Sequence, residues 1–200
     1  MKLPAAKDRR EQKVQTRARL IATAQRLFAR RGIVGTSTAD VAAAARVAHG
    51  TVFVHFPTRD DLIMAVLEEF ATRIPARVRE LALRTEPTLR DVLEAHVQAI
   101  SEQEALYATL VVERPHLPRA ARSRLVILLS AVAYIFRDAA QREIAAGEIR
   151  KLPLGLMFNG WLGLLHHYVC NRDLFMEGPS VLAERGPALV QHFLDMVKAP

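Results

Sequence analysis

The chain has 200 residues, half of them apolar and 24% charged, and its formal net charge is +7 at pH 7. This composition excludes a disordered polar chain and provides enough apolar residues to bury a core in one or two domains. Residues 1–59 carry a charge of +9 and residues 60–200 carry −2, which indicates a polyanionic partner for the first segment.

The cysteine content and the uncharged runs indicate in which cellular compartment the protein is expected. Cys170 is the single cysteine, so no internal disulfide is possible, and the opening MKLPAAKDRREQ contains no apolar stretch of the kind found in signal peptides. The uncharged run 152–170 is long enough to cross a bilayer, but Pro153 and Asn159 favour a helix buried in protein. We therefore expect a cytoplasmic protein with no membrane partner.

The first periodic segment begins at Thr16. Its apolar residues repeat at the spacing of one helical face: Leu20, Ile21, Ala24, Leu27 and Phe28. Gly32 then provides a C-terminal stop signal. Residues 1–15 are basic and lack this periodicity, so we expect a flexible basic arm there.

Two capping signatures mark the next helix starts. Ser37 and Asp40 have capping-box spacing and predict a short alanine-rich helix from Thr38 to about residue 45. Thr58 and Asp61 repeat the signature and open another helix. The sequence therefore predicts two helices that begin about twenty residues apart.

The octet HGTVFVHF, residues 49–56, lies between these helix starts. Its β-branched and aromatic residues have strand propensity. A lone strand in an otherwise helical sequence would leave its backbone groups unpaired, because no partner strand or hairpin turn is nearby. We therefore predict a helix, with Val52 and Phe56 on its buried face.

The remaining sequence consists of apolar periodic stretches separated by proline or glycine. The predicted helices lie at about 76–84, 88–101, 104–113, 119–146, 152–170 and 180–198. We find no convincing strand or internal repeat. The sequence therefore predicts an all-α fold.

The two short helices have the spacing of a helix-turn-helix. Ala42, Val47 and Val52 occupy the interior positions of two helices that cross at a tight turn. The second helix then presents Gly50, Thr51, Val54 and His55 to a DNA groove. A helical hairpin that binds no nucleic acid fits the interior positions equally well, but it leaves the basic segment and the polar outward residues unexplained.

These residues carry a family resemblance. LIATAQRLFARRG, GTSTADVAAAARVAHGTVFVHF and PTRDDL, within residues 16–62, strongly resemble the DNA-binding domain of TetR-type transcriptional repressors. The resemblance implies a three-helix DNA-binding domain over residues 16–60 and a helical ligand-binding and dimerisation domain over residues 61–200. It also implies repression, a homodimer on a double-stranded inverted-repeat operator, and a small-molecule effector that releases the DNA.

From the helix-turn-helix geometry and the resemblance together, we expect ten residues to contact DNA: Ser37, Thr38, Arg46, His49, Gly50, Thr51, Phe53, Val54, His55 and Arg59. Arg59 stands where the family usually has a lysine that contacts the DNA backbone, and Ser37 and Thr38 would present a helix N-terminus to phosphate. The sequence departs from the family at three positions: Arg46 replaces a turn glycine, Ala48 a capping serine and Phe53 a tyrosine.

The resemblance places the dimer interface on residues 152–170 and 180–198, packed as a four-helix bundle across the two-fold axis. We expect their apolar residues to cover both the core and the partner. These residues are Leu156, Leu164, Leu165, Val169, Leu182, Leu189, Val190, Phe193 and Val197.

The effector pocket is expected in the C-terminal domain. Candidate lining residues are Tyr107, His116, Tyr134, Phe136, Met157, Asn159, Trp161, His166 and Tyr168, and for each the alternative is an ordinary core position.

Two rival functions remain open. The i, i+4 pair His166 and Cys170 raises a metal site or metal-dependent enzyme, and the basic segment raises non-specific architectural binding of nucleic acid. The pair lacks a carboxylate on the same turn, and the chain has no phosphate-binding glycine loop, nucleophile elbow or paired-carboxylate motif. We therefore expect neither an enzyme nor a cofactor.

Overall fold

The structure, a computed structural model, describes residues 6–82, 86–175 and 178–200. Over these ranges the chain is helical, and its only β-type pairing is an isolated bridge between Ile149 and Lys198. The elements are α1 (Ala6–Arg31), α2 (Thr38–Ala45), α3 (His49–His55), α4 (Arg59–Ala82), α5 (Leu89–Ser101), α6 (Glu104–Val112), the 3₁₀ turn η1 (Arg114–His116), α7 (Arg119–Ala145), α8 (Leu154–Cys170), α9 (Arg172–Phe175) and α10 (Val181–Val197). The prediction of an all-α fold is confirmed.

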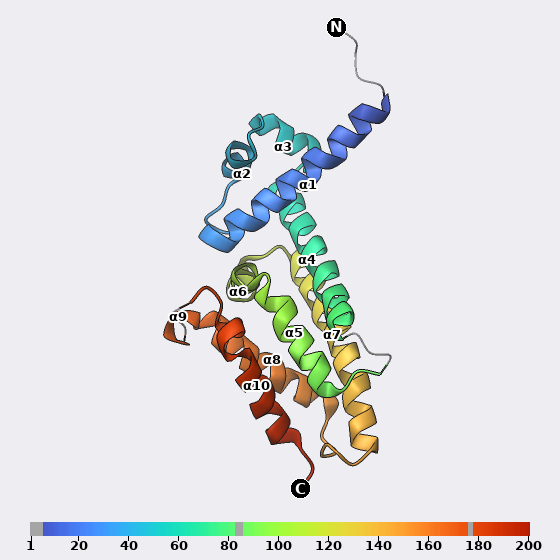
Figure 1. The fold of residues 1–200 in the computed structure, drawn as a ribbon. Helices are drawn as coiled ribbons and strands as arrows, with labels where there is room; N and C mark the ends of the chain where they lie inside the picture. The colour runs from blue at the N-terminus through green and yellow to red at the C-terminus, as the bar shows by residue number, and fades with distance from the viewer. Residues whose placement is uncertain (1–5, 83–85, 176–177) are drawn as a thin grey trace.

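Helices α1 to α3 form one end of the elongated molecule, and α4 runs from them toward its middle (Figure 1). Helix α4 packs against α5 and α7, α10 packs against α5 and α8, and α6 packs against α1. One continuous apolar core extends through both parts. The domain boundary at residue 60 stays a prediction, since α4 begins at Arg59 and belongs to both parts.

The octet is helical, as predicted. Helix α3 covers His49–His55, and the Phe56 amide closes its last turn by donating to the Val52 carbonyl at 2.8 Å. Val52 is fully buried and Phe56 is 2% exposed, with the Arg17 guanidinium 5.1 Å from the Phe56 ring centre. Burial of these two side chains offsets the strand propensity of the segment.

The expected flexible arm is partly helical. Helix α1 begins at Ala6, so residues 6–15 continue the helix, while residues 1–5 lie outside the described residues. This stretch, AKDRREQKVQ, is rich in residues with high helix propensity, and Val14 is 63% exposed. Residues 9–15 are exposed, so this part of α1 is helical without an apolar buried face.

A proline inside α4 also corrects an expectation. The sequence suggested a separate helix over about 76–84, but α4 continues through the buried Pro75 to Ala82. Residues 83 and 84 of the expected helix lie outside the described ranges. Proline removes one intrahelical hydrogen bond, and α4 stays helical across this position while it packs against α1, α5 and α7.

The residues expected to serve both the core and a partner mostly serve the core alone. Seven are buried within the protomer: Leu165, Val169, Leu182, Leu189, Val190, Phe193 and Val197. Leu156 is 69% exposed and Leu164 is half-buried. Periodicity identifies the apolar face of a helix but does not show whether the core or a partner covers that face.

Along the described residues, no helix combines the length and the apolar character needed to cross a membrane.

Helix α10 begins at a buried carboxylate. Glu104, 3% exposed, accepts hydrogen bonds from the Ser180 hydroxyl at 2.6 Å, the Val181 amide at 3.0 Å and the Leu182 amide at 2.9 Å. The first amides of a helix have no intrahelical acceptor, so this side chain satisfies two buried donors that would otherwise be unpaired.

Replacing Glu104 with alanine should therefore destabilise the protein. We expect Glu104→Ala to lower the free energy of unfolding by about 2–4 kcal/mol, because each buried unpaired donor costs about 1–3 kcal/mol. Urea denaturation measures the change. The exposed Glu69→Ala on α4 is the control and should stay within about 0.5 kcal/mol of the parent; equal stability of the two variants would contradict this role.

Candidate functional site

Helix α2 starts with the predicted capping box. The Ser37 hydroxyl accepts from the Asp40 amide at 3.1 Å, and the Ser37 amide donates to Asp40 Oδ2 at 2.8 Å. The Ser37 hydroxyl also donates to Asp40 Oδ2. The hydrogen bonds that this oxygen accepts from the Ser37 hydroxyl and amide, with a smaller contribution from Arg31, hold the pKa of Asp40 below its usual value. The capping fixes where α2 begins, and with it the position of Thr38.

The turn between α2 and α3 is left-handed at Arg46. Its φ and ψ are 54° and 49°, the one positive φ among the described non-glycine residues. The turn closes with hydrogen bonds from the Arg46 amide to Ala43 at 3.1 Å and from the Val47 amide to Ala42 at 3.0 Å. A non-glycine residue in this conformation costs on the order of 1–2 kcal/mol. Ala48, the N-cap of α3, makes no side-chain capping bond.

The outer face of α3 combines small, polar and apolar groups. Phe53 is 43% exposed and Val54 is 67% exposed, and open space surrounds the position where Gly50 would carry a Cβ. His49 Nε2 lies 3.0 Å from Thr38 Oγ1, and the His49 ring lies 5.1 Å from that of Phe53. The first residues of α2 and α3 thus meet beside one continuous exposed surface, which we call the α3 face: Thr38, His49, Gly50, Phe53 and Val54.

His55 departs from its expected orientation. Its side chain is half-buried, and Nδ1 is buried with no hydrogen-bond partner among the described residues. Burial is the main cause that lowers its pKa, followed by the nearby charges of Lys13 and Arg17 on α1. His55 therefore lies beside α1 instead of sharing the open surface of Val54, while Thr51 is half-buried at the edge of that surface.

Arg59 also differs from its expected place. Its Nε and Nη2 donate to the Thr36 carbonyl at 3.3 and 3.2 Å, and Nη2 donates to the Ile33 carbonyl as well. The guanidinium therefore binds the loop between α1 and α2 instead of lying free at the surface. Its assignment as a phosphate contact stays a prediction.

Glu113, at the end of α6, binds the same loop. The sequence analysis did not predict this contact. Glu113 Oε2 accepts from the Ile33 amide at 2.8 Å and from the Val34 amide at 2.9 Å. A Cβ at Gly32, where φ is +77°, would lie 2.1 Å from Glu113 Oε1. We call residues 32–36 with Glu113 and Arg59 the loop clamp. No local pattern around Glu113 indicates this contact across eighty positions.

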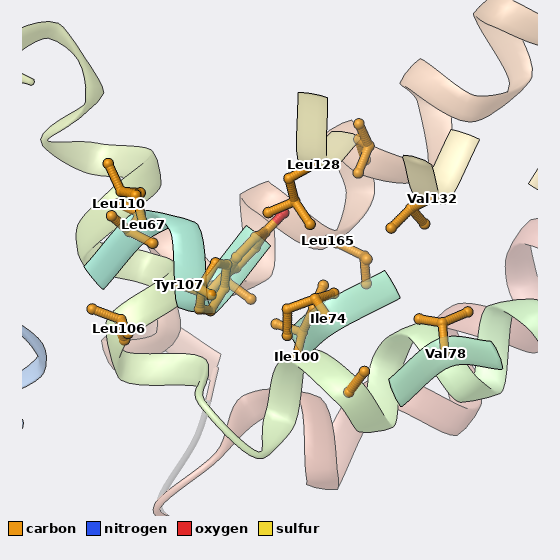
Figure 2. Close-up of a cluster of buried hydrophobic side chains, with 14 of the residues drawn as sticks. Leu67, Ile74, Val78, Ile100, Leu106, Tyr107, Leu110, Leu128, Val132 and Leu165 are labelled. Carbon is orange, nitrogen blue, oxygen red and sulfur yellow. The ribbon is translucent and has the colours of Figure 1, made fainter. Parts of the chain in front are cut away.

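A cavity of about 290 Å³ lies between α6, η1, α7 and α8. Its lining residues are Tyr107, Leu110, Val111, Arg114, Leu125, Leu128, Leu129 and His166. Figure 2 shows Tyr107 among Leu67, Leu110 and Ile74, with its hydroxyl oxygen directed toward Leu128. That hydroxyl lies 2.7 Å from His166 Nε2. Burial raises the pKa of Tyr107 and, together with a smaller effect of Arg114, lowers that of His166.

Two of the nine candidate ligand residues, Tyr107 and His166, line this cavity. Three others are core residues: Phe136, Met157 and Trp161. The side chains of His116, Tyr134 and Asn159 are exposed, and Tyr168 packs on Phe175 with ring centres 4.6 Å apart. The sequence missed Arg114 and the leucines, because aliphatic side chains facing a cavity follow the same helical spacing as those facing a core.

The rival metal site gains no support from the geometry. His166 Nε2 is paired with Tyr107, and Cys170 is half-buried on the next turn. Over the described ranges of the chain, no three His, Cys, Asp or Glu side chains gather as a metal-binding group.

The left-handed conformation of Arg46 predicts that glycine at this position stabilises the protein more than alanine does. Arg46→Gly should be about 1 kcal/mol more stable than Arg46→Ala, because both variants lose the charge and only glycine relieves the backbone strain. Thermal or urea denaturation measures the difference. If the two variants unfold at the same denaturant concentration, the left-handed conformation is not a cost to the protein.

Comparison with known proteins gives matches over the N-terminal part and over the fold. Residues 20–66 match the family model described as bacterial regulatory proteins, tetR family. The HTH-type transcriptional repressor Rv3405c of Mycobacterium tuberculosis is 39% identical over 89 residues, which cover 39% of this chain and 47% of that protein. The chain spans about half the length of the curated relatives it matches first.

Solved structures match over nearly the whole chain. A TetR-family regulator from Agrobacterium tumefaciens superposes with a TM-score of 0.77 at 18% identity, covering 94% of this chain and all of that one. FadR from Bacillus subtilis, solved with stearoyl-CoA, gives 0.74 at 18% identity and covers 90% and 98% of the two chains. At these identities the likeness shows the fold alone.

Proposed function

We propose that residues 20–66 form the DNA-binding domain of a tetR-family regulator, because they match that family model and the molecule has the fold of solved TetR-family regulators. From this premise we propose that it is a sequence-specific transcriptional repressor that binds an inverted-repeat operator in double-stranded DNA as a homodimer. We further propose that a small-molecule effector in the cavity releases the operator. The relatives are named as transcriptional regulators and not as enzymes.

The observation that carries this proposal is the α3 face on a strongly basic segment. An α-helix fits the major groove of B-DNA, and Gly50 allows the backbone of α3 to approach a base edge closely. The exposed methyl groups of Val54 are suited to contact with a thymine methyl. Arg46, exposed at the turn, and the helical basic residues of α1 supply charges for phosphates.

A homodimer follows from the small size of the reading element. Helix α3 has seven residues, so one copy reads few base pairs, and two copies on an inverted repeat would supply the missing specificity. The proposed interface is the outer face of α8 and α10. On α8 it combines Leu156 with the exposed Asn159, Gly160 and Gly163, and small residues there would let two protomers approach closely.

The loop clamp gives the proposed route from the cavity to the DNA. Arg114 and Val111 line the cavity, and Glu113 between them holds the amides of the α1–α2 loop. An effector that moves the end of α6 would therefore move this loop and, with it, α2 and α3. Such an effector releases DNA only to the extent that it prefers the spacing of α3 helices that does not fit the operator.

Selection of bound duplexes from a random pool tests the proposal. We expect an enriched inverted repeat whose half-site centres lie about one helical turn of DNA, or a multiple of it, apart. Non-specific architectural binding predicts no enriched sequence and affinity that disappears almost entirely with salt. A selection that enriches nothing would contradict the repressor assignment.

Two substitutions separate base reading from phosphate binding. Val54→Ala should reduce the preference for thymine at one position in each half-site by roughly three- to tenfold. Arg46→Ala should weaken binding to all sequences and reduce the salt slope by about one for each phosphate that the variant no longer neutralises. Arg79→Ala, at the far end of α4, is the control and should leave both properties unchanged. Operator titrations at several salt concentrations measure these effects.

A further inference from the structure

The cavity has an apolar body and one charged lining residue. Five aliphatic side chains form most of its wall: Leu110, Val111, Leu125, Leu128 and Leu129. Among the described residues, Arg114 is the one charged residue of the lining, to which no described aspartate or glutamate contributes. A ligand that matches this wall has a hydrocarbon surface and a single anionic group.

The charge of Arg114 is not neutralised within the described part of the chain. The neighbouring Glu113 directs its carboxylate to the Ile33 and Val34 amides, and no described carboxylate forms an ion pair with Arg114. Arg114 also disfavours protonation of His166, which lines the same cavity. Arg114 is exposed and lines the cavity, so its guanidinium is available to pair with the anionic group of a ligand.

Tyr107 and His166 provide a hydrogen-bonding group whose direction can adapt. With Tyr107 Oη and His166 Nε2 2.7 Å apart, neutral histidine either accepts the tyrosine proton or, as the other tautomer, donates to the tyrosine oxygen. In the second arrangement the tyrosine hydroxyl is free to donate to a ligand oxygen. His96 and Cys170 also lie near this pair, and the burial that raises the pKa of Tyr107 keeps its hydroxyl protonated.

The size of the cavity restricts the ligand further. Its volume of about 290 Å³ lies at the lower end of the roughly 300–1,000 Å³ that is usual for small-molecule sites. It therefore suits a compact molecule of one or two rings better than a long chain with a large head group. The relative solved with stearoyl-CoA shares the fold but does not define the ligand of this chain.

We propose that the cavity binds a compact apolar carboxylic acid as its anion, with the carboxylate held by Arg114 and the Tyr107 hydroxyl and the hydrocarbon packed on the leucines of α6 and α7. This inference rests on the proposed function, in which the cavity is the effector site. Guanidinium groups match carboxylates geometrically and bind them through charge-assisted hydrogen bonds.

Isothermal titration calorimetry of the full chain tests the inference with a matched pair of probes. We expect 2-naphthoate to bind at least tenfold more tightly than its neutral analogue 2-naphthamide. Arg114→Gln should lower the affinity for 2-naphthoate at least tenfold and leave that for 2-naphthamide within about twofold. Arg119→Gln, an exposed arginine at the start of α7 outside the cavity lining, is the control and should bind both probes as the parent does.

Three outcomes would overturn the inference: no detectable binding of 2-naphthoate, equal affinity for the two probes, or unchanged binding of 2-naphthoate by Arg114→Gln. Equal affinity would assign the cavity to neutral ligands. Because calorimetry needs no DNA, these outcomes are separate from the duplex selection. An enriched operator without naphthoate binding would leave the repressor proposal standing, and naphthoate binding without an enriched operator would leave the ligand assignment standing.

Discussion

The position of the proposed reading helices depends on how one short loop satisfies its backbone. The residues between α1 and α2 lie outside any helix, so their amides and carbonyls need partners from elsewhere. Glu113 accepts from the Ile33 and Val34 amides, and Arg59 donates to the Ile33 and Thr36 carbonyls. Two side chains of opposite charge, one from each neighbouring element, thus orient α2 and α3 relative to α4 and α6.

The proposed reading unit contains two locally unfavourable features. Arg46 is left-handed without being glycine, and Ala48 leaves the start of α3 without a side-chain cap. Burial of Val52 and Phe56 compensates for both. Local compromises of this kind gather where function competes with stability, and here the same arginine that strains the turn adds an exposed charge beside the α3 face.

Whether a structural feature of this protein can be predicted from its sequence depends on how far apart along the chain the interacting residues lie. The helical octet, the cap at Ser37 and the buried Val52 were predictable because each rests on contacts within a few residues or on helical spacing. The partners of Arg59 and Glu113 were not, since they join segments far apart in the chain. The same limit explains the cavity and the apolar residues of α8 and α10, where spacing alone does not separate core, pocket and partner.

Hydrogen exchange over the α1–α2 loop, compared between the parent and Glu113→Ala, tests the clamp most directly. If the Glu113 carboxylate restrains the loop, the Ile33 and Val34 amides should exchange at least about tenfold faster in the variant, since each loses its acceptor. Peptides from α5 and α10 should exchange as in the parent. Two results would contradict the claim that the clamp positions α2 and α3. The loop amides of Glu113→Ala could exchange at the parent rate, or the control Glu69→Ala could show the same increase in loop exchange.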